Sequence, residues 1–277
     1  MLFSLVFVSH VTGNLVDGKI GFETPLDFTN RDNYLVGRFV TYLNHVDQSD
    51  KRVFPQRYWY STEQFDVEKG PIFLYICGEY TCNVPYTREF PHQLSKQHNG
   101  LYLVLEHRYY GESQPFTSDW STENLKYLNV ENALADIAMF LSKINDEIVS
   151  TFGGEKRKIV VVGGSYPGAL SAWARYKYPH IIDAAISSSG VVNAILDYDM
   201  YDYQIYNSTA RSGGECPGVI RNMTYGIDMF IRFNMTTEMT RLKQLFNAES
   251  LRDSDFAFFF ADQFADKVQY GQRTQLC

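Results

Sequence analysis

One serine lies between a β-branched run and a helical pattern. Lys158–Val162 predict a buried strand that stops at Gly163 and Gly164, and apolar residues resume in helical spacing after Ser165. Strand, tight turn, serine and helix are the parts of a nucleophile elbow. Such a turn raises the serine hydroxyl above the sheet, at the positive end of the helix. The chemistry this favours is attack of the serine oxygen on a carbonyl carbon.

The residues around this serine fit the elbow with one departure. Gly163 falls two positions before the serine, where strand and helix crowd together, and the backbone N–H of Tyr166 is placed to bind an oxyanion. Pro167 stands where G-x-S-x-G has its second glycine, and that glycine comes one position later, at Gly168. Proline is compatible with the first turn of a helix. The elbow turn is therefore assigned to Gly163, Gly164 and Gly168, and the alternative is an ordinary serine in a glycine-rich turn.

Strands and helices alternate through the first two thirds of the chain. Buried strands are predicted at 71–76 and 101–105, an amphipathic helix at 129–148, and a further strand at 181–187. Weaker strand patterns occur at 39–43 and 57–60. This order predicts an α/β fold with a mostly parallel sheet. The polar loops after residues 76, 105 and 162 would then meet at the edge where Ser165 is exposed.

The pattern changes near residue 195. Helical spacing dominates from there, as at 239–246 and 256–268, and no strand–helix alternation remains. We therefore expect an α/β core over residues 14–195, with residues 14–35 irregular, and the start of a helical domain inserted into that core over residues 196–277.

Composition excludes several classes of partner. The chain has 277 residues and a net charge of −7, and no basic stripe indicates nucleic-acid binding. No internal run is long and apolar enough to span a membrane, and the cysteine spacing matches no metal site. No cofactor or metal is expected, and a homodimer is left open as an assembly.

Three features indicate the secretory pathway. Residues 1–13 have the apolar character of a signal peptide, although the usual basic start is missing and a first buried strand is the alternative. Three N-x-[ST] sequons begin at Asn207, Asn222 and Asn234. Four cysteines are compatible with disulfides: Cys77 could pair with Cys82 and Cys216 with Cys277, but the sequence does not fix the connectivity.

Several blocks of the chain, in order from about residue 38 to the end, resemble one peptidase family. They are Phe54-Pro-Gln-Arg-Tyr-Trp59, Glu106-His-Arg-Tyr-Tyr-Gly-Glu-Ser-Gln-Pro-Phe116, Gly163-Gly-Ser-Tyr-Pro-Gly168, Ser187-Ser-Ser-Gly-Val-Val-Asn-Ala194 and Val268-Gln-Tyr-Gly271. The sequence is similar to the serine exopeptidases that include lysosomal prolyl (Pro-X) carboxypeptidase, dipeptidyl peptidase II and thymus-specific serine protease. The block from Glu106 to Ser113 is the most diagnostic, because generic lipases and esterases do not contain it.

The resemblance implies a fold, a site and an activity. It implies an α/β-hydrolase core with a helical cap, and cleavage next to proline near a peptide terminus in a secreted or lysosomal setting. Ser165 would be the nucleophile and Tyr166 one oxyanion donor, with Gly78 and Glu79 on the loop where this fold places the second donor. Many family members have glycine or another small residue where this chain has Pro167, which puts the geometry of the turn in question.

The histidine base and the acid that would activate Ser165 are not evident from the sequence. In this fold a histidine follows the serine in the chain, and His180 is the one histidine after Ser165. The intervening helix of about fifteen residues puts it on the order of 20 Å away. His107 lies on a loop at the correct edge, but the resemblance places it in a structural block. Glu106 and Glu112 could either face the pocket or form a buried pair with Arg108. Because the acid and histidine of the family follow the cap, we expect this chain to be the N-terminal portion of such a peptidase.

Two other functions remain open. A truncated relative could serve as a secreted binding protein, using the aromatic surface left where further strands would pack. A generic lipase or esterase is disfavoured, because the chain also lacks an HGGG-type oxyanion loop.

Overall fold

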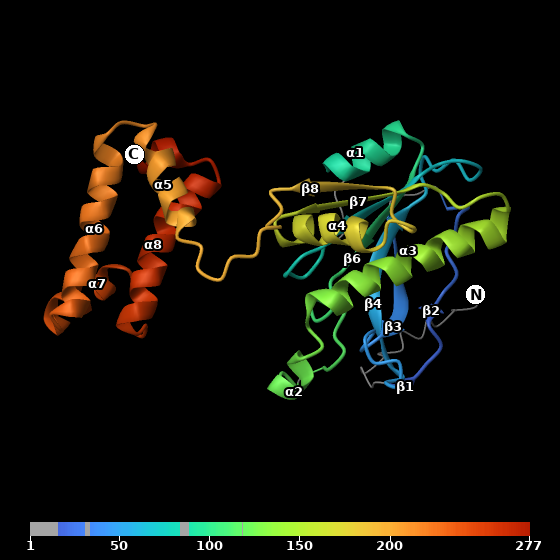
Figure 1. The fold of residues 1–277 in the computed structure, drawn as a ribbon, viewed down its shortest axis with the longest axis horizontal. Helices are drawn as coiled ribbons and strands as arrows, with labels where there is room; N and C mark the ends of the chain where they lie inside the picture. The colour runs from blue at the N-terminus through green and yellow to red at the C-terminus, as the bar shows by residue number, and fades with distance from the viewer. Residues whose placement is uncertain (1–15, 31–33, 84–88, 118) are drawn as a thin grey trace, which may run out of the picture. The chain divides into compact units, whose positions relative to one another are not determined.

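The chain folds into two compact units. The computed structural model describes residues 16–30, 34–83, 89–117 and 119–277, and it divides into residues 1–194 and residues 195–277 (Figure 1). The predicted signal peptide, residues 1–13, lies outside the described residues.

The first unit is built on one twisted sheet. Its strands are β1 (Val16–Asp17), β2 (Gly21–Phe22), β3 (Leu35–Tyr42), β4 (Arg52–Ser61), β5 (Ile72–Ile76), β6 (Leu101–Leu105), β7 (Ile159–Gly164) and β8 (Ala184–Ser188). They are ordered β2-β3-β4-β6-β5-β7-β8, with β1 paired to β4. The pairs β6–β5, β5–β7 and β7–β8 are parallel. Since β1, β3 and β6 all pair antiparallel with β4, they run in the same direction as β5, β7 and β8.

Helices cover both faces of this sheet (Figure 1). The long helix α3 (Val130–Phe152) and the helix α4 (Tyr166–Lys177) pack on one face, and α1 (Phe90–Gln97) packs on the other against β5 and β6. Alternate residues of each strand supply the two layers: Leu74 joins the core under α3 and α4, whereas Phe73 joins the smaller cluster beside α1. A short helix, α2 (Thr122–Leu125), precedes α3.

This arrangement confirms the predicted α/β-hydrolase-type, mostly parallel sheet. The long helix and all the predicted strands are present, with shifted ends. The expectation of an irregular segment at 14–35 is wrong in part, because it contains β1 and β2. These two-residue strands are too short to show an alternating pattern in the sequence.

A buried arginine ties the loop after β6 to the long helix. Arg108 is fully buried and makes a two-pronged ion pair with Asp136 of α3, through Nε to Oδ2 at 2.6 Å and Nη2 to Oδ1 at 2.8 Å. Its remaining donors reach the carbonyl oxygens of Tyr42, Leu43 and Tyr127. All parts of the guanidinium are therefore satisfied, as a buried charge requires.

Asp136 has further partners on β3 and the turn after it. Its Oδ1 accepts a hydrogen bond from the hydroxyl of Thr41 at 3.1 Å and lies 2.7 Å from Nε2 of His45. Burial raises the pKa of this carboxyl, but the charge and hydrogen bonds of Arg108 outweigh burial and hold it below its usual value. Of the two alternatives for Glu106 and Glu112, pairing with Arg108 is wrong, because Asp136 neutralises this arginine instead.

The second unit is helical. It contains α5 (Met200–Ala210), α6 (Glu215–Arg232), α7 (Thr236–Leu245), α8 (Asp253–Gln269) and α9 (Arg273–Leu276). Phe256, Phe260 and Phe264 of α8 form the centre of its own apolar cluster, with Ile227 and Met239 from α6 and α7. The Cys216–Cys277 disulfide joins the start of α6 to the last residue. That this unit is the beginning of an inserted cap stays a prediction.

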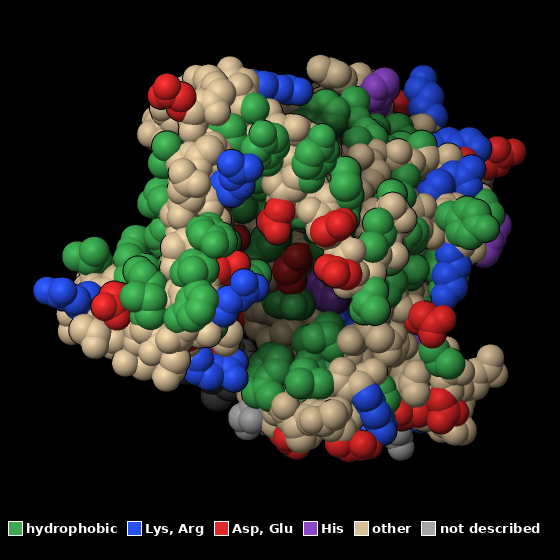
Figure 2. Space-filling model, turned by 60° about the vertical axis from the view of Figure 1, so that its left-hand side comes forward, with side chains coloured by type: hydrophobic (Ala, Val, Ile, Leu, Met, Phe, Trp, Pro, Cys, Tyr) green, Lys and Arg blue, Asp and Glu red, His purple; other side chains and the backbone are tan. Residues whose placement is uncertain are grey.

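On the face drawn in Figure 2, both basic and acidic side chains are present, and no basic stripe crosses it. Across the described ranges, no helix has the length and apolar character needed to cross a bilayer.

Replacing Asp136 by asparagine is expected to lower the free energy of unfolding by about 3–5 kcal/mol, because it leaves the buried Arg108 charge unpaired. Equilibrium urea unfolding at pH 7 measures this loss. Lys158→Gln, which breaks an exposed pair with Asp183, is the control and is expected to cost less than about 1 kcal/mol. Equal effects of the two changes would contradict the assignment.

The same ion pair predicts a pH dependence. The folded pKa of Asp136 lies below the ordinary aspartate value of 3.8. The stabilising contribution of the charged form is therefore complete above the unfolded pKa and is lost as pH falls through the folded pKa. Asp136→Asn should remove this part of the acid sensitivity below about pH 4, as measured by unfolding at several pH values.

Candidate active site

Ser165 lies at the sharp turn between β7 and α4. Its backbone has φ 61° and ψ −127°, a conformation that is strained for a residue with a side chain. The backbone N–H donates to the carbonyl of Ser188 at the end of β8, 2.9 Å away. The side chain is exposed, and its hydroxyl makes no hydrogen bond to any described residue. This is the geometry of a nucleophile elbow.

Close packing explains the glycines of the turn. A Cβ on Gly163 would lie 2.1 Å from the carbonyl oxygen of Pro167, and one on Gly168 would lie 2.7 Å from that of Ser188. Neither contact is compatible with a side chain, because both neighbours are backbone atoms. Gly164 is different: its Cβ would meet nothing closer than 3.9 Å. Two of the three predicted elbow glycines are thus sterically required.

Pro167 fits the turn, so the departure from G-x-S-x-G does not distort it. It is buried in the first turn of α4, where a backbone N–H is not needed for the helix. Its ring packs against the loop after β5, since a Cβ on Gly78 would lie 2.8 Å from Cγ of Pro167. The start of α4 and the Gly78–Glu79 loop are therefore in direct contact.

The three predicted oxyanion donors lie on these two adjoining segments. The N–H of Tyr166 is in the first turn of α4, where a helix leaves its amides without internal partners. The N–H groups of Tyr166, Gly78 and Glu79 make no hydrogen bond within the described part of the chain. Unpaired amides beside a nucleophilic serine can receive the negative oxygen of a tetrahedral intermediate.

The disulfide Cys77–Cys82 closes the loop that carries Gly78 and Glu79. This pairing and Cys216–Cys277 are the two that the sequence left open. Both ends of the loop are also held from the strand beside it: Cys77 N–H donates to the carbonyl of Leu105 at 3.1 Å, and Cys82 N–H donates to Oε1 of Glu106 at 3.1 Å.

Glu106 is a fully buried carboxylate with partners on three segments. Arg57 of β4 donates to both its oxygens, with Nη2 at 2.6 Å from Oε1 and Nε at 3.2 Å from Oε2. Oε2 also accepts from the backbone of Glu112 and from the backbone and hydroxyl of Ser113. Sequence reasoning missed the role of Arg57, although it lies in a quoted block, because no local spacing links residues 57 and 106.

The described histidines are engaged away from Ser165. His45 pairs with Asp136, His92 hydrogen-bonds to Tyr34, and His98 stacks on Phe73. Nε2 of His107 lies 3.0 Å from the hydroxyl of Tyr166, and its Nδ1 lies 2.8 Å from the carbonyl of Arg108. His180 follows the end of α4, as expected from the length of that helix.

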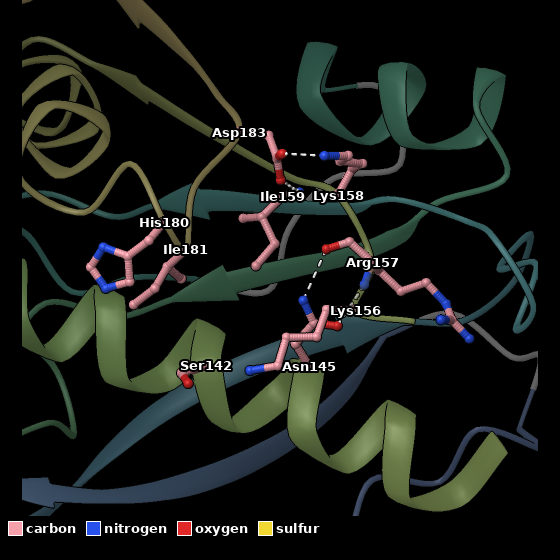
Figure 3. A pocket seen from close by; sticks show the side chains of 9 residues that line it. All are labelled: Ser142, Asn145, Lys156, Arg157, Lys158, Ile159, His180, Ile181 and Asp183. Carbon is pink, nitrogen blue, oxygen red and sulfur yellow. Dashed lines mark hydrogen bonds and ion pairs between the residues drawn. The ribbon is translucent and has the colours of Figure 1, made fainter. Parts of the chain in front are cut away.

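His180 belongs to a pocket at the opposite edge of the sheet. Figure 3 shows His180 and Ile181 beside the start of β7, with Asn145 of α3 across from them. This cavity of about 160 Å³ is lined by Lys156, Arg157 and Lys158 as well. Asn145 exchanges two hydrogen bonds with the backbone of Arg157, at 2.8 and 2.9 Å, and Lys158 pairs with Asp183 at 2.8 Å. The polar groups here fasten β7 to its neighbours, far from the serine.

The sequons lie in the helical unit. Asn207 is in α5, Asn222 in α6, and Asn234 in the turn between α6 and α7. Within the described ranges, no group of three or more His, Cys, Asp or Glu side chains could hold a metal ion.

The chain is similar to one family of known proteins. The profile of the Serine carboxypeptidase S28 family matches residues 41–276. The chain belongs to this family. The match contains the elbow, the Cys77–Cys82 loop, the loop after β6 and almost all of the helical unit.

Individual relatives support the same family. The chain is 36% identical over 240 residues to the probable serine protease EDA2 of Arabidopsis thaliana, covering 85% of this chain and 47% of the relative. It is 36% identical to the probable extracellular serine carboxypeptidase of Arthroderma benhamiae, over 74% of this chain and 29% of the relative. It is 30% identical to lysosomal Pro-X carboxypeptidase of Mus musculus, over 70% of this chain and 40% of the relative. The chain thus spans less than half the length of these curated relatives.

Solved structures that resemble the chain include dipeptidyl peptidase 4 of Porphyromonas gingivalis, with a TM-score of 0.39 and 16% identity over 56% of this chain and 21% of that chain.

Gly163→Ala is expected to destabilise the fold by about 1–3 kcal/mol or more, because its methyl group would overlap the backbone of Pro167. Gly164→Ala is the matched control, since the neighbouring methyl group has space. Thermal unfolding of the two variants checks this, and an equal shift in Tm for both would show that the crowding of strand and helix is absent.

Proposed function

We propose that the protein is a serine-type exopeptidase that acts through an acyl-enzyme on Ser165. The observation that carries this proposal is the strained, exposed serine at a turn whose helix start contacts the Gly78 loop, on which, as at Tyr166, backbone N–H groups have no partner among the described residues. Membership of the S28 family supports it.

In the proposed reaction, Oγ of Ser165 attacks the carbonyl carbon of the scissile peptide bond, and its proton passes to a histidine base. The negative oxygen that forms is received by the N–H of Tyr166 and by the Gly78–Glu79 loop. The C–N bond then breaks as the amine takes the proton from the histidine. Water hydrolyses the remaining ester on Ser165 and restores the hydroxyl.

The histidine and its orienting acid are proposed to lie outside these 277 residues. The resemblance implies that both follow the cap in the chain, and the described histidines all have other partners or positions. The alternative is a catalytically inactive relative that acts as a secreted binding protein. The activity test below separates this alternative from the peptidase.

The proposed substrates are peptides with proline near one terminus. The name of the mouse relative, lysosomal Pro-X carboxypeptidase, supports this class, as does the resemblance. Carboxypeptidase and aminodipeptidase action both stay open, because the family that the sequence resembles includes both kinds of enzyme. Homodimer formation stays a prediction.

Ser165→Ala in the full-length protein is expected to abolish hydrolysis of fluorogenic peptides that carry proline next to the scissile bond. Loss of the nucleophile leaves at most the small rate advantage of binding and the oxyanion hole. Ser49→Ala, in an exposed turn, is the control and should retain full activity. Hydrolysis by the wild-type protein that survives Ser165→Ala, or its complete absence in the wild type, would overturn the proposed function.

A secreted or lysosomal location is proposed from the names of the relatives and from the three sequons. Of these sequons, Asn234 is the most accessible in the folded unit, because it is exposed in a turn with φ 53°. Asn207 is partly buried in a helix, and the hydroxyl of Thr209 in its sequon is buried against backbone carbonyls.

Asn234→Gln is therefore expected to remove one N-glycan when the protein is made in a secretory eukaryotic host. The measurement is the mobility of the variant beside wild type, each with and without enzymatic deglycosylation. Asn207→Gln is the comparison and should change mobility less. An unchanged mobility for Asn234→Gln would show that this site is not used.

A further inference from the structure

Three consecutive residues after β6 send buried side chains to three different parts of the first unit. Glu106 and Arg108 are fully buried, and His107 is 6% exposed. Arg108 reaches α3 and Glu106 reaches the Cys77–Cys82 loop, as described above. His107 reaches Tyr166, the residue directly after the nucleophile. The proposed reaction does not by itself use any of these side chains.

The hydrogen bonds of His107 define the roles of its two nitrogens. A carbonyl oxygen only accepts, so the Nδ1 that lies 2.8 Å from the carbonyl of Arg108 carries the proton. Nε2 is then the acceptor for the hydroxyl of Tyr166, 3.0 Å away. Burial lowers the pKa of His107, which favours the neutral ring that this arrangement requires. Burial also raises the pKa of Tyr166 to about 12, so its phenol retains the proton that it donates.

Both ring nitrogens of His107 therefore have hydrogen-bond partners, the carbonyl of Arg108 and the hydroxyl of Tyr166. A general base needs a free nitrogen within hydrogen-bond reach of the serine hydroxyl, and His107 has none in this arrangement. The buried contact instead fixes the side chain of Tyr166, whose ring lies 5.5 Å from the imidazole and packs against the main core. Tyr166 carries one of the unpaired N–H groups at the turn.

The second pair of donors is held by the residues just before His107. The loop with Gly78 and Glu79 is hydrogen-bonded at one end to the carbonyl of Leu105 and at the other to the carboxylate of Glu106. The stretch from Leu105 to His107 thus contacts both segments that carry the proposed oxyanion donors.

Resting on the proposed function, we propose that His107 is a positioning residue for the oxyanion hole: its hydrogen bond to the Tyr166 hydroxyl fixes one donor against the loop that Glu106 holds. His107 touches neither substrate nor the reacting atoms. Its effect is to keep the Tyr166 amide aimed at the place where negative charge develops. The orientation of this amide strongly affects stabilisation of the transition state and has little effect on binding of the ground state.

The test uses steady-state kinetics of the full-length enzyme with Tyr166→Phe, which removes the hydroxyl and retains the ring. We expect kcat to fall about tenfold or more, because a misoriented oxyanion donor loses part of its stabilisation of the transition state, although less than a deleted donor would. KM should stay within about twofold of the wild-type value. Tyr110→Phe is the matched control: its ring also lies 5.5 Å from His107, but its hydroxyl makes no hydrogen bond to a described residue. That variant should keep the wild-type kcat.

Substitution of His107 provides the second arm. His107→Phe should lower kcat as Tyr166→Phe does, and the double variant should be no worse than either single variant, since each removes the same bond. His107→Gln supplies a side-chain oxygen that can accept from Tyr166, and it should recover most of the activity. The affinity for a peptide boronate that imitates the tetrahedral intermediate should fall in parallel with kcat, while the affinity for product stays unchanged.

The outcomes separate this inference from the proposed function. If Ser165-dependent hydrolysis is present and Tyr166→Phe keeps the wild-type kcat, the positioning role is overturned and the proposed function stands. Additive losses in the double variant, or loss of product affinity together with kcat, would likewise show a general packing role. If the wild-type enzyme shows no hydrolysis that depends on Ser165, the proposed function itself fails.

Discussion

The first unit depends on the neutralisation of two opposite charges that the chain buries directly after β6. A buried ion costs several kcal/mol unless it is paired and fully hydrogen-bonded, so each must find its own partners. Arg108 does so with Asp136 on α3, and Glu106 does so with Arg57 on β4 and with nearby backbone N–H groups. Because the partners lie on different elements, the need to satisfy both charges restricts the path of the loop after β6. That path brings the intervening His107 to the elbow.

Steric crowding acts alongside these charges. The elbow has no room for side chains at Gly163 and Gly168, and the loop with Gly78 contacts the ring of Pro167. Crowding alone sets how closely strand, helix and loop approach. It does not determine which way the loop amides face. The directional bonds from Leu105, Glu106 and His107 supply that information, and so the two kinds of constraint are complementary.

The sequence predicted the features that depend on local pattern. The β-branched run before Ser165, the glycine two residues earlier and the apolar spacing of α3 each follow from one stretch of chain, and they located the sheet, the elbow and the long helix. Pairings between distant residues could not be read in this way. Arg57 and Glu106 are 49 residues apart, and Arg108 meets Asp136 only because α3 folds back over the sheet. Residues 16–22 form strands too short for any periodic signal.

A hydrolase site must hold its oxyanion donors in place before the substrate arrives, because reorganising them during the reaction would raise the barrier. Backbone amides suit this purpose, but their direction is set only by the segments that carry them. In the site proposed for this chain, those segments belong to different parts of the sequence, near residues 78 and 166, and neither contacts the other through a hydrogen bond in the described residues. In that proposal, a third segment that bonds to both makes them act as one site. Glu106 and His107 occupy that position, which accounts for the physical role of the block that most clearly marked the family.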